Sequence, residues 1–420
     1  MEFNKLFPTP SDRMGTIWTL STIEDAYIVE FGPAGTTHFA IEGLMQLNAD
    51  HNAKVYTTHI SETDISFGKH DRLVKAIIEI DSQYKPKYIF VMASSISAVI
   101  GTDIEAICFE LQPKVKSKLI PITTGGFNGD HTTGIENTLN MLCKEVVKEA
   151  ESKRAKTYNI IGNNADTYNF LSDVEEIKSI LKEGFDFEVN TVFTAYTSID
   201  DIESTTRGQI NLVLRGEGIK AAISLLKEYG MDYYYGRPYG MEGTTAWIRE
   251  LEKLLGVSAN ENYINKKLAQ LRRHVMSFKF MLREVKNKSA ILVGDYDVVI
   301  GLAGLLEELG LNIESIIVKH KLSKEVKKLV PERWQNIVKV NLSEREIEEY
   351  LKSTPSYLLL ADGATLKLKN SSRLHLQIAN PNFIKYNIYP YTPFVGYNGV
   401  LYLIQCLHEL AREEKFLRIV

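Results

Sequence analysis

The glycine-rich segment of residues 124–134 contains the side chains best suited to proton transfer. Asp130 and His131 lie in Thr-Gly-Gly-Phe-Asn-Gly-Asp-His-Thr-Thr-Gly, which follows directly on an apolar, strand-like run. Polar loops at strand ends often carry function, and histidine titrates near neutral pH. We therefore interpret His131, Asp130 and the upstream His38 as candidate catalytic acid–base groups. An Asx-type turn at Asp130 and a partly buried structural role for His38 are the alternatives.

A second set of residues is suited to binding. Gly32 and Gly35 occupy a turn between a predicted strand and a predicted helix, where free N–H groups can point at a ligand. Arg215 ends another apolar run, and its fixed charge can hold an anion or pair with Glu217. No turn has a GxGxxG or Walker A pattern, so the sequence does not indicate nucleotide binding.

These residues follow short apolar runs that alternate with longer amphipathic stretches through most of the chain. This alternation predicts an α/β fold of parallel β-α-β units. We expect three doubly wound Rossmann-like domains with parallel sheets around a central cleft. The predicted division is residues 1–155 for domain I with an interface segment, 156–258 for domain II, 259–287 for a connecting helix and 288–420 for domain III.

Composition restricts the class of partner. The chain of 420 residues has a formal net charge of −4, which argues against nucleic acid or an anionic membrane as the main partner. No apolar run reaches about 18 residues, and the first residues lack the apolar core of a signal peptide. Cys108, Cys143 and Cys406 are far apart and match no metal-ligand spacing. We expect a cytoplasmic protein in a reducing compartment.

Seven segments in chain order resemble motifs of one known family. They are Gly32-Pro-Ala-Gly-Thr-Thr-His-Phe, Glu62-Thr-Asp-Ile-Ser-Phe-Gly-Lys, Ala93-Ser-Ser-Ile-Ser-Ala-Val-Ile-Gly, Gly126-Phe-Asn-Gly-Asp-His-Thr-Thr-Gly, Arg237-Pro-Tyr-Gly-Met-Glu-Gly, Gly294-Asp-Tyr-Asp-Val-Val-Ile-Gly and Pro393-Phe-Val-Gly-Tyr-Asn-Gly. Over nearly its whole length the chain is similar to the nitrogenase component 1 superfamily. That group includes nitrogenase α and β subunits, cofactor-scaffold proteins and dark protochlorophyllide reductase subunits, and the resemblance is to a divergent β-type member.

The departures from the family pattern concern metal binding. Family subunits usually supply three cysteines to an interface iron–sulfur cluster, and the equivalent positions here are Ser11, Thr36 and Ser95. Hydroxyls are poor iron ligands beside thiolates. One relative uses aspartate in place of a cysteine, so the resemblance makes Asp12 a candidate cofactor ligand. The cysteine that holds the active-site cofactor in α subunits falls near Arg215. The resemblance therefore implies no metal site and no cofactor bound by this chain alone.

By resemblance, we expect a subunit of a nitrogenase-like oxidoreductase complex that receives electrons from an ATP-dependent iron–sulfur reductase. Its other partner would be a related component-1-like subunit, identical or different. The sequence leaves open whether the two subunits jointly hold an iron–sulfur cluster, a tetrapyrrole or a metallocofactor. It also leaves open whether this chain is itself catalytic. The alternative is a cluster-free scaffold or binding protein for a tetrapyrrole or metallocofactor precursor. A metal-free enzyme that uses His131, His38 and Asp130 is a third hypothesis.

Overall fold

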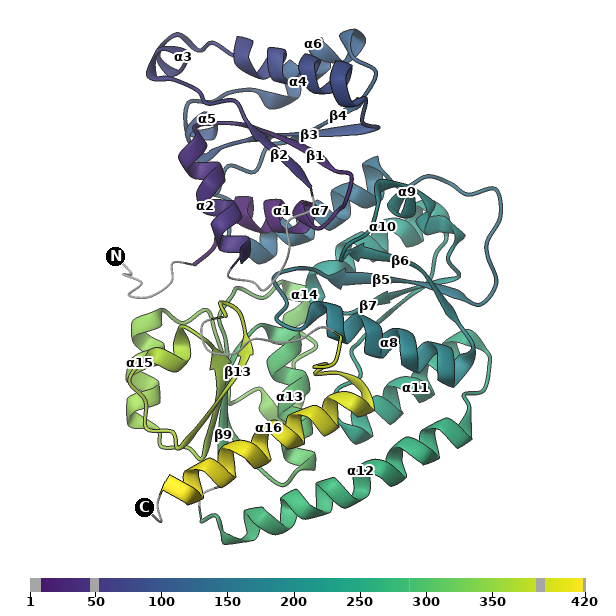
Figure 1. Ribbon diagram of the computed structural model, residues 1–420, viewed down its shortest axis with the longest axis vertical. Helices are drawn as coiled ribbons and strands as arrows, with labels where there is room; N and C mark the ends of the chain where they lie inside the picture. Colours follow the sequence, from purple (N-terminus) through teal and green to yellow (C-terminus); the bar gives the residue numbers. More distant parts are fainter. Residues whose placement is uncertain (1–8, 46–52, 287, 383–389, 418–420) are drawn as a thin grey trace.

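The computed structural model describes residues 9–45, 53–286, 288–382 and 390–417. The strands in these ranges form three sheets, and every pair of neighbouring strands within a sheet is parallel. Figure 1 shows the first sheet above the other two, which lie side by side below it. The α/β class with parallel sheets is therefore confirmed, while the predicted domain boundaries stay a prediction. No helix within the described ranges is both long and apolar enough to cross a membrane.

The first sheet has a fully buried central strand, because helices cover both of its faces. Its strands, in spatial order, are β2 (Lys54–Thr57), β1 (Tyr27–Phe31), β3 (Tyr88–Ala93) and β4 (Lys118–Ile122). Its helices are α1 (Asp12–Ser21), α2 (Ala34–Met45), α3 (Glu62–Phe67), α4 (Asp71–Tyr84), α5 (Ser95–Val99), α6 (Ile104–Leu111) and α7 (His131–Glu145), with a 3-10 turn η1 (Gln112–Lys114).

The second sheet is built in the same way. Its strands, in spatial order, are β6 (Glu188–Thr194), β5 (Thr157–Asn163), β7 (Ile210–Val213) and β8 (Tyr233–Tyr235). The helical elements of this part are α8 (Phe170–Phe185), α9 (Ile199–Glu203), η2 (Ser204–Arg207), η3 (Gly216–Gly218), α10 (Ile219–Tyr229) and α11 (Met241–Leu255). A long helix, α12 (Glu261–Met281), and the short η4 (Leu282–Glu284) then lead to the third sheet.

The third sheet has five strands. In spatial order they are β11 (Val338–Val340), β10 (Asn312–Val318), β9 (Ser289–Gly294), β12 (Leu358–Asp362) and β13 (Leu374–Ala379). Its helical elements are α13 (Tyr296–Glu308), α14 (Lys324–Lys327), η5 (Glu332–Trp334), α15 (Glu344–Ser353), η6 (Thr365–Lys367) and α16 (Gly396–Leu417).

All three sheets share one feature of strand order. The first strand of each sheet is interior, and the chain adds later strands first on one side of it and then on the other. The order reverses between β1 and β3, between β5 and β7, and between β9 and β12. A crevice opens at such a reversal at the carboxyl ends of parallel strands, and ligands of open α/β sheets usually bind there.

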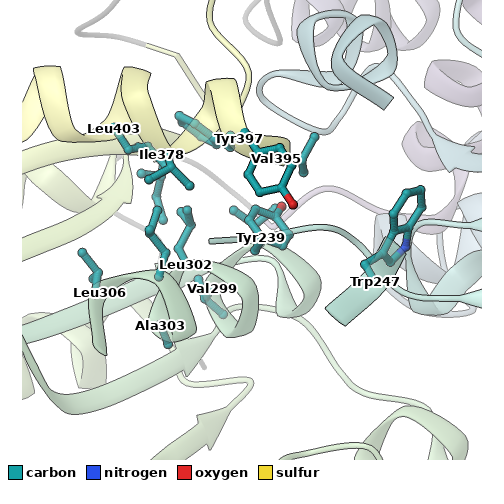
Figure 2. Close-up of a cluster of buried hydrophobic side chains, with 14 of the residues drawn as sticks. Tyr239, Trp247, Val299, Leu302, Ala303, Leu306, Ile378, Val395, Tyr397 and Leu403 are labelled. Carbon is teal, nitrogen blue, oxygen red and sulfur yellow. The ribbon is translucent and has the colours of Figure 1, made fainter. Parts of the chain in front are cut away.

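Apolar packing joins the second and third sheets through the C-terminal helix. Figure 2 shows Tyr239 between Val299 and Leu302 of α13 on one side and Tyr397 of α16 on the other. These side chains belong to one continuous buried cluster, which also contains Trp247. The two lower sheets and α16 therefore share a hydrophobic core.

A buried carboxylate fastens the first turn of α16. Glu176 of α8 accepts hydrogen bonds from the backbone N–H of Asn398 at 3.1 Å and from its Nδ2 at 2.7 Å. Burial raises the pKa of Glu176 to about 7, although the two bonds from Asn398 oppose the shift. Near neutral pH the protein thus holds a carboxylate that binds a proton more readily when the chain is folded.

This raised pKa predicts a specific pH dependence of stability. The folded-state pKa of Glu176, about 7, lies above the ordinary value of 4.5, so this group favours folding most below pH 4.5 and loses that contribution as the pH rises through 7. Glu176→Gln should remove this dependence, and its free energy of unfolding relative to wild type should rise by about 1–3 kcal/mol between pH 5 and pH 8. Urea denaturation at several pH values measures it. The control is Glu175→Gln, which alters a half-buried pair with Lys178 and should show a difference that does not change with pH. Equal behaviour of the two variants would contradict the assignment.

Candidate functional site

One cavity lies where the three sheets meet, with a volume of about 110 Å³. The first part of the chain contributes Trp18 and His131 to its wall, and the second contributes Asp166. Most of the wall comes from strand ends of the third sheet, including Asp295 after β9 and Lys319 after β10. The cavity therefore occupies the reversal point between β9 and β12, in agreement with the expected central cleft.

A close helix crossing places Trp18 and His131 in this wall. A Cβ atom added to Gly15 of α1 would overlap the backbone oxygen of His131, and one added to Gly134 of α7 would overlap the backbone oxygen of Asp12. The two backbones therefore touch at positions where only glycine fits. The ring of His131 lies 6.0 Å from that of Trp18 as a result, measured between centroids.

The His131 ring also faces His320, at 6.3 Å between centroids. The Nε2 atom of His320 accepts the backbone N–H of Tyr296 at 3.1 Å, and its Nδ1 lies 3.0 Å from the carbonyl oxygen of Lys321. Because a backbone N–H can only donate, the Nε2 that accepts it carries no proton. His320 therefore carries its proton on Nδ1, which donates it to the carbonyl of Lys321. Within the described chain the buried Nδ1 of His131 has no hydrogen-bond partner. The histidine that the sequence singled out therefore contributes to the cavity wall and has a buried polar atom without a partner among the described residues.

Asp130 is held by its own helix end. Its Oδ1 accepts the backbone N–H of Thr132 at 3.0 Å, and its Oδ2 accepts the backbone N–H of Lys321 at 3.2 Å. Burial acts to raise the pKa of Asp130, but the nearby His131 and the bonds from Thr132 and Lys321 outweigh burial and hold it below the ordinary value. Asp130 is therefore an N-cap that ties α7 to the third sheet, beside His131 but outside the cavity lining.

Asp12 is also engaged by the backbone. It is completely buried, its Oδ1 accepts the N–H of Arg13 at 2.9 Å, and its Oδ2 accepts the N–H of Asn128 at 3.3 Å. Burial raises its pKa despite these bonds. Its carboxylate thus joins α1 to the loop after β4, and a metal would have to displace both donors.

Arg215 lies behind the cavity wall and is paired with two carboxylates. Its Nη1 contacts both carboxylate oxygens of Asp166, at 2.9 and 2.7 Å, and its Nε contacts Glu217 at 2.7 Å. Burial disfavours the charge of Arg215, but the two carboxylates outweigh burial and raise its pKa. Burial likewise acts against the charge of Glu217, whose pKa Arg215 nevertheless holds below the ordinary value. Of the two hypotheses for Arg215, pairing with Glu217 is what the structure shows, and Arg215 also orients Asp166.

Lys319 is a cation in the cavity wall that the sequence did not single out. Its Nζ lies 2.8 Å from Oδ2 of Asp362, and about a third of its side chain is exposed. Both residues follow or end apolar strands that are evident in the sequence. Lys319 and Asp166 could have been found in the sequence only because each follows a predicted strand. Many other polar residues also follow strands, so this position does not distinguish them.

Ser11, Thr36 and Ser95, the positions that the resemblance equates with family cysteines, lie near the reversal point of the first sheet. A Cβ atom added to Gly126 would lie 3.0 Å from Oγ of Ser95 and 3.4 Å from Oγ of Ser11. Thr36 lies in the first turn of α2. A Cβ on Gly32 would overlap Ser94 and lie 3.6 Å from Oγ1 of Thr36. Position 32 thus requires glycine because the ends of two neighbouring strands pack closely there.

This donor set does not suit an iron–sulfur cluster. Such clusters are held by thiolates, whereas Ser11, Thr36 and Ser95 offer hydroxyl oxygens. Among the residues that the structure describes, no group of three His, Cys, Asp or Glu side chains could hold a metal ion. All three cysteines are buried, and burial raises the pKa of Cys108 to about 12, so that thiol stays protonated.

Five apolar side chains that follow the hydroxyl residues or Gly126 closely in sequence are exposed. Ile96 and Val99 of α5 and the adjacent Ile100 are exposed, with 72% of Val99 accessible. Phe127 follows Gly126 and is 65% accessible, and Phe39 of α2 is 53% accessible. We call these five residues the hydroxyl-side patch. Exposed apolar residues gathered in this way mark interaction surfaces.

His38 and Gly35 lie on α2, away from the cavity. The Nε2 atom of His38 is 3.0 Å from Oε1 of Glu42, and 73% of the His38 side chain is exposed. A Cβ atom added to Gly35 would meet nothing within 4 Å. The structure thus brings Asp130 and His131 together, with Arg215 behind the same wall, and places His38, Gly32 and Gly35 beside the hydroxyl residues. The roles proposed for all of them stay predictions.

Comparisons with known proteins agree with this arrangement. A family model described as nitrogenase component 1 type oxidoreductase matches residues 11–411. The nitrogenase iron-molybdenum cofactor biosynthesis protein NifE of Nostoc sp. is 24% identical over 406 residues, 94% of this chain and 81% of the relative. A light-independent protochlorophyllide reductase subunit of Heliobacterium modesticaldum is 25% identical over 292 residues, 68% of this chain and 55% of the relative. A solved structure of nitrogenase Cp1 at pH 6.5 has the same fold, with a TM-score of 0.81, 19% identity and coverage of 99% of this chain and 95% of that chain.

The helix crossing predicts the effect of one added methyl group. Gly134→Ala would place a Cβ against the backbone oxygen of Asp12, and because no side chain can rotate away, the helices must separate. We expect a loss of about 1–3 kcal/mol of unfolding free energy, measured by urea denaturation. The matched control is Gly243→Ala in α11, whose Cβ would meet nothing within 4 Å and which should gain up to about 1 kcal/mol. Equal effects of the two substitutions would rule out a tight crossing.

The buried ion pairs predict a stability role for Arg215. Arg215→Met would leave Asp166 and Glu217 without their cation, at an expected cost of about 3–5 kcal/mol in unfolding free energy. Adding Asp166→Asn and Glu217→Gln should recover part of this loss, because the buried charges are then removed as well. Chemical denaturation of the single and triple variants measures both effects. A single variant as stable as wild type, or a triple variant less stable than the single one, would refute the pairing.

Proposed function

Because the chain belongs to the nitrogenase component 1 type oxidoreductase family, we propose that it works as a cytoplasmic subunit of a nitrogenase-like complex. In this proposal the chain pairs with a related component-1-like subunit. That partner supplies the cluster thiolates, and an ATP-dependent iron–sulfur reductase supplies the electrons. The observation that carries the proposal is the hydroxyl-side patch around Ser11, Thr36 and Ser95.

The patch supports a partner for a simple physical reason. Val99 and Phe127 expose most of their apolar surface to water, and burying apolar surface contributes roughly 25 cal/mol per Å². A partner subunit would cover these side chains and enclose the neighbouring hydroxyl residues. An interface of at least ~2,000 Å² is typical of obligate pairs. The hydroxyls would then face the partner's metal site without ligating it.

The relatives favour a second candidate function. NifE is named a cofactor biosynthesis protein, and this name belongs to several of the similar proteins. The alternative is therefore a cluster-free scaffold that holds a tetrapyrrole or metallocofactor precursor. Its supporting observation is His131, which lines the central cavity and whose buried Nδ1 has no hydrogen-bond partner among the described residues. An imidazole nitrogen can hydrogen-bond such a ligand or bind its metal. The role of His131 as acid, base or ligand belongs to this proposal.

Association through the patch is tested by one pair of variants. Val99→Asp places a charge in the hydroxyl-side patch and should abolish co-purification with a cysteine-bearing component-1-like subunit under anaerobic conditions, because a buried unpaired charge is costly. Leu329→Asp alters an exposed leucine of the third part, 47% accessible, and should leave co-purification intact. Iron analysis of each purified sample accompanies the measurement.

The outcomes separate the two candidate functions. Iron that co-purifies with the wild-type and Leu329→Asp complexes but not with the Val99→Asp chain supports the redox subunit. A chain that is monomeric in every sample and retains a coloured ligand, lost in His131→Ala without loss of stability, supports the scaffold. Stoichiometric iron in the isolated chain that His131→Ala does not remove would contradict both.

A further inference from the structure

A run of positive charge extends along α12 and the segment that follows it. Residues 266–288 contain eight lysines and arginines and one glutamate, although the whole chain has a formal net charge of −4. The inner face of the helix is apolar and buried, with Tyr263, Leu271 and Phe278 packed on the core. Figure 1 shows α12 along the lower edge of the molecule, on the opposite side from α2 and α5.

Two large apolar side chains stand among these cations. Met276 is 70% accessible and Phe280 is 67% accessible, and they are four residues apart on the helix. Arg272 and Arg273 precede them and Arg283 follows, all exposed. Residues at spacings of three and four share one face of a helix. We call Arg272, Arg273, Met276, Phe280 and Arg283 the α12 stripe, which is roughly 16 Å long at 1.5 Å per residue.

The cations of the stripe have no anionic partner within the described part of the chain. No ion pair connects Arg272, Arg273 or Arg283 to a described carboxylate, whereas Arg249 near the start of the same region is paired with both Glu252 and Glu261. The guanidinium of Arg283 lies 5.5 Å from the centre of the Phe280 ring. The stripe thus combines unpaired guanidinium groups with an exposed aromatic ring.

We propose that the α12 stripe docks an acidic surface of a partner protein. Guanidinium groups bind carboxylates in a bidentate manner, and arginine, methionine and phenylalanine are the residue types enriched at protein interfaces. A membrane-bound amphipathic helix inserts its apolar face into lipid, whereas the apolar face of α12 lies in the protein core. This surface is independent of the hydroxyl-side patch and of the function proposed above.

Charge reversal tests the proposal on the full chain. The probe is a glutamate-rich amphipathic peptide, with its lysine-rich counterpart as the first control. The acidic peptide should bind at low salt and weaken as salt rises, because exposed charges are screened. Arg272→Glu combined with Arg273→Glu should raise Kd at least about tenfold, and Phe280→Ala should also weaken binding. Lys114→Glu combined with Lys116→Glu changes the net charge equally on the first part of the chain, where both side chains are exposed, and should leave Kd unchanged.

Four results would overturn the proposal. They are no binding of the acidic peptide, equal loss in the control and stripe variants, tighter binding to anionic phosphatidylserine vesicles than to the peptide, and tighter binding to duplex DNA. Thermal unfolding of each variant shows that the comparison is made on folded protein. Hydrogen exchange gives a second readout: the acidic peptide should slow exchange at the exposed stripe of the wild-type chain and leave the 114–116 region unaffected.

Discussion

The backbone contact between α1 and α7 is the constraint on which the candidate site depends. Gly15 and Gly134 let the two helices touch, and this contact decides where the first residues of both helices stand. It places Asp12 against the loop after β4 and His131 at the central cavity. Asp130 then ties the same helix end to the third sheet through a backbone hydrogen bond. One close crossing therefore links the first sheet, the cavity and the third sheet.

Charges beneath the cavity are neutralised in pairs, and this limits what the site can do. Arg215 is occupied by Asp166 and Glu217, and Lys319 is occupied by Asp362. Buried charges need such partners because burial removes their hydration. Asp166 and Lys319 of the cavity wall are thus each paired with an opposite charge, while the buried Nδ1 of His131 has no partner among the described residues. A ligand there would meet a rigid wall, which suits a binding or partner-completed site.

The interpretation of individual residues from sequence succeeded where their role is local. Asp130 follows a strand and begins a helix, and it caps that helix as an Asx-type residue, which was the alternative to an acid–base role. Pairing of Arg215 with Glu217, two residues away, was also evident as an alternative. The partner Asp166 lies 49 residues away and was not identified. His38 resembles His131 as a residue after a glycine turn, yet it faces solvent beside a glutamate of its own helix.

The sequence by itself determined the α/β class and the strand-end positions of the polar residues. These properties follow from local periodicity, which acts over a few neighbouring residues. The hydroxyls at positions 11, 36 and 95 were singled out by the family resemblance alone. Only the tertiary structure decided that the cavity is walled by His131, Asp166 and Lys319, and that Ser11 meets Ser95 across Gly126. Those contacts join residues far apart in the chain, so they depend on how closely helices and sheets pack, and packing is a property of the whole fold.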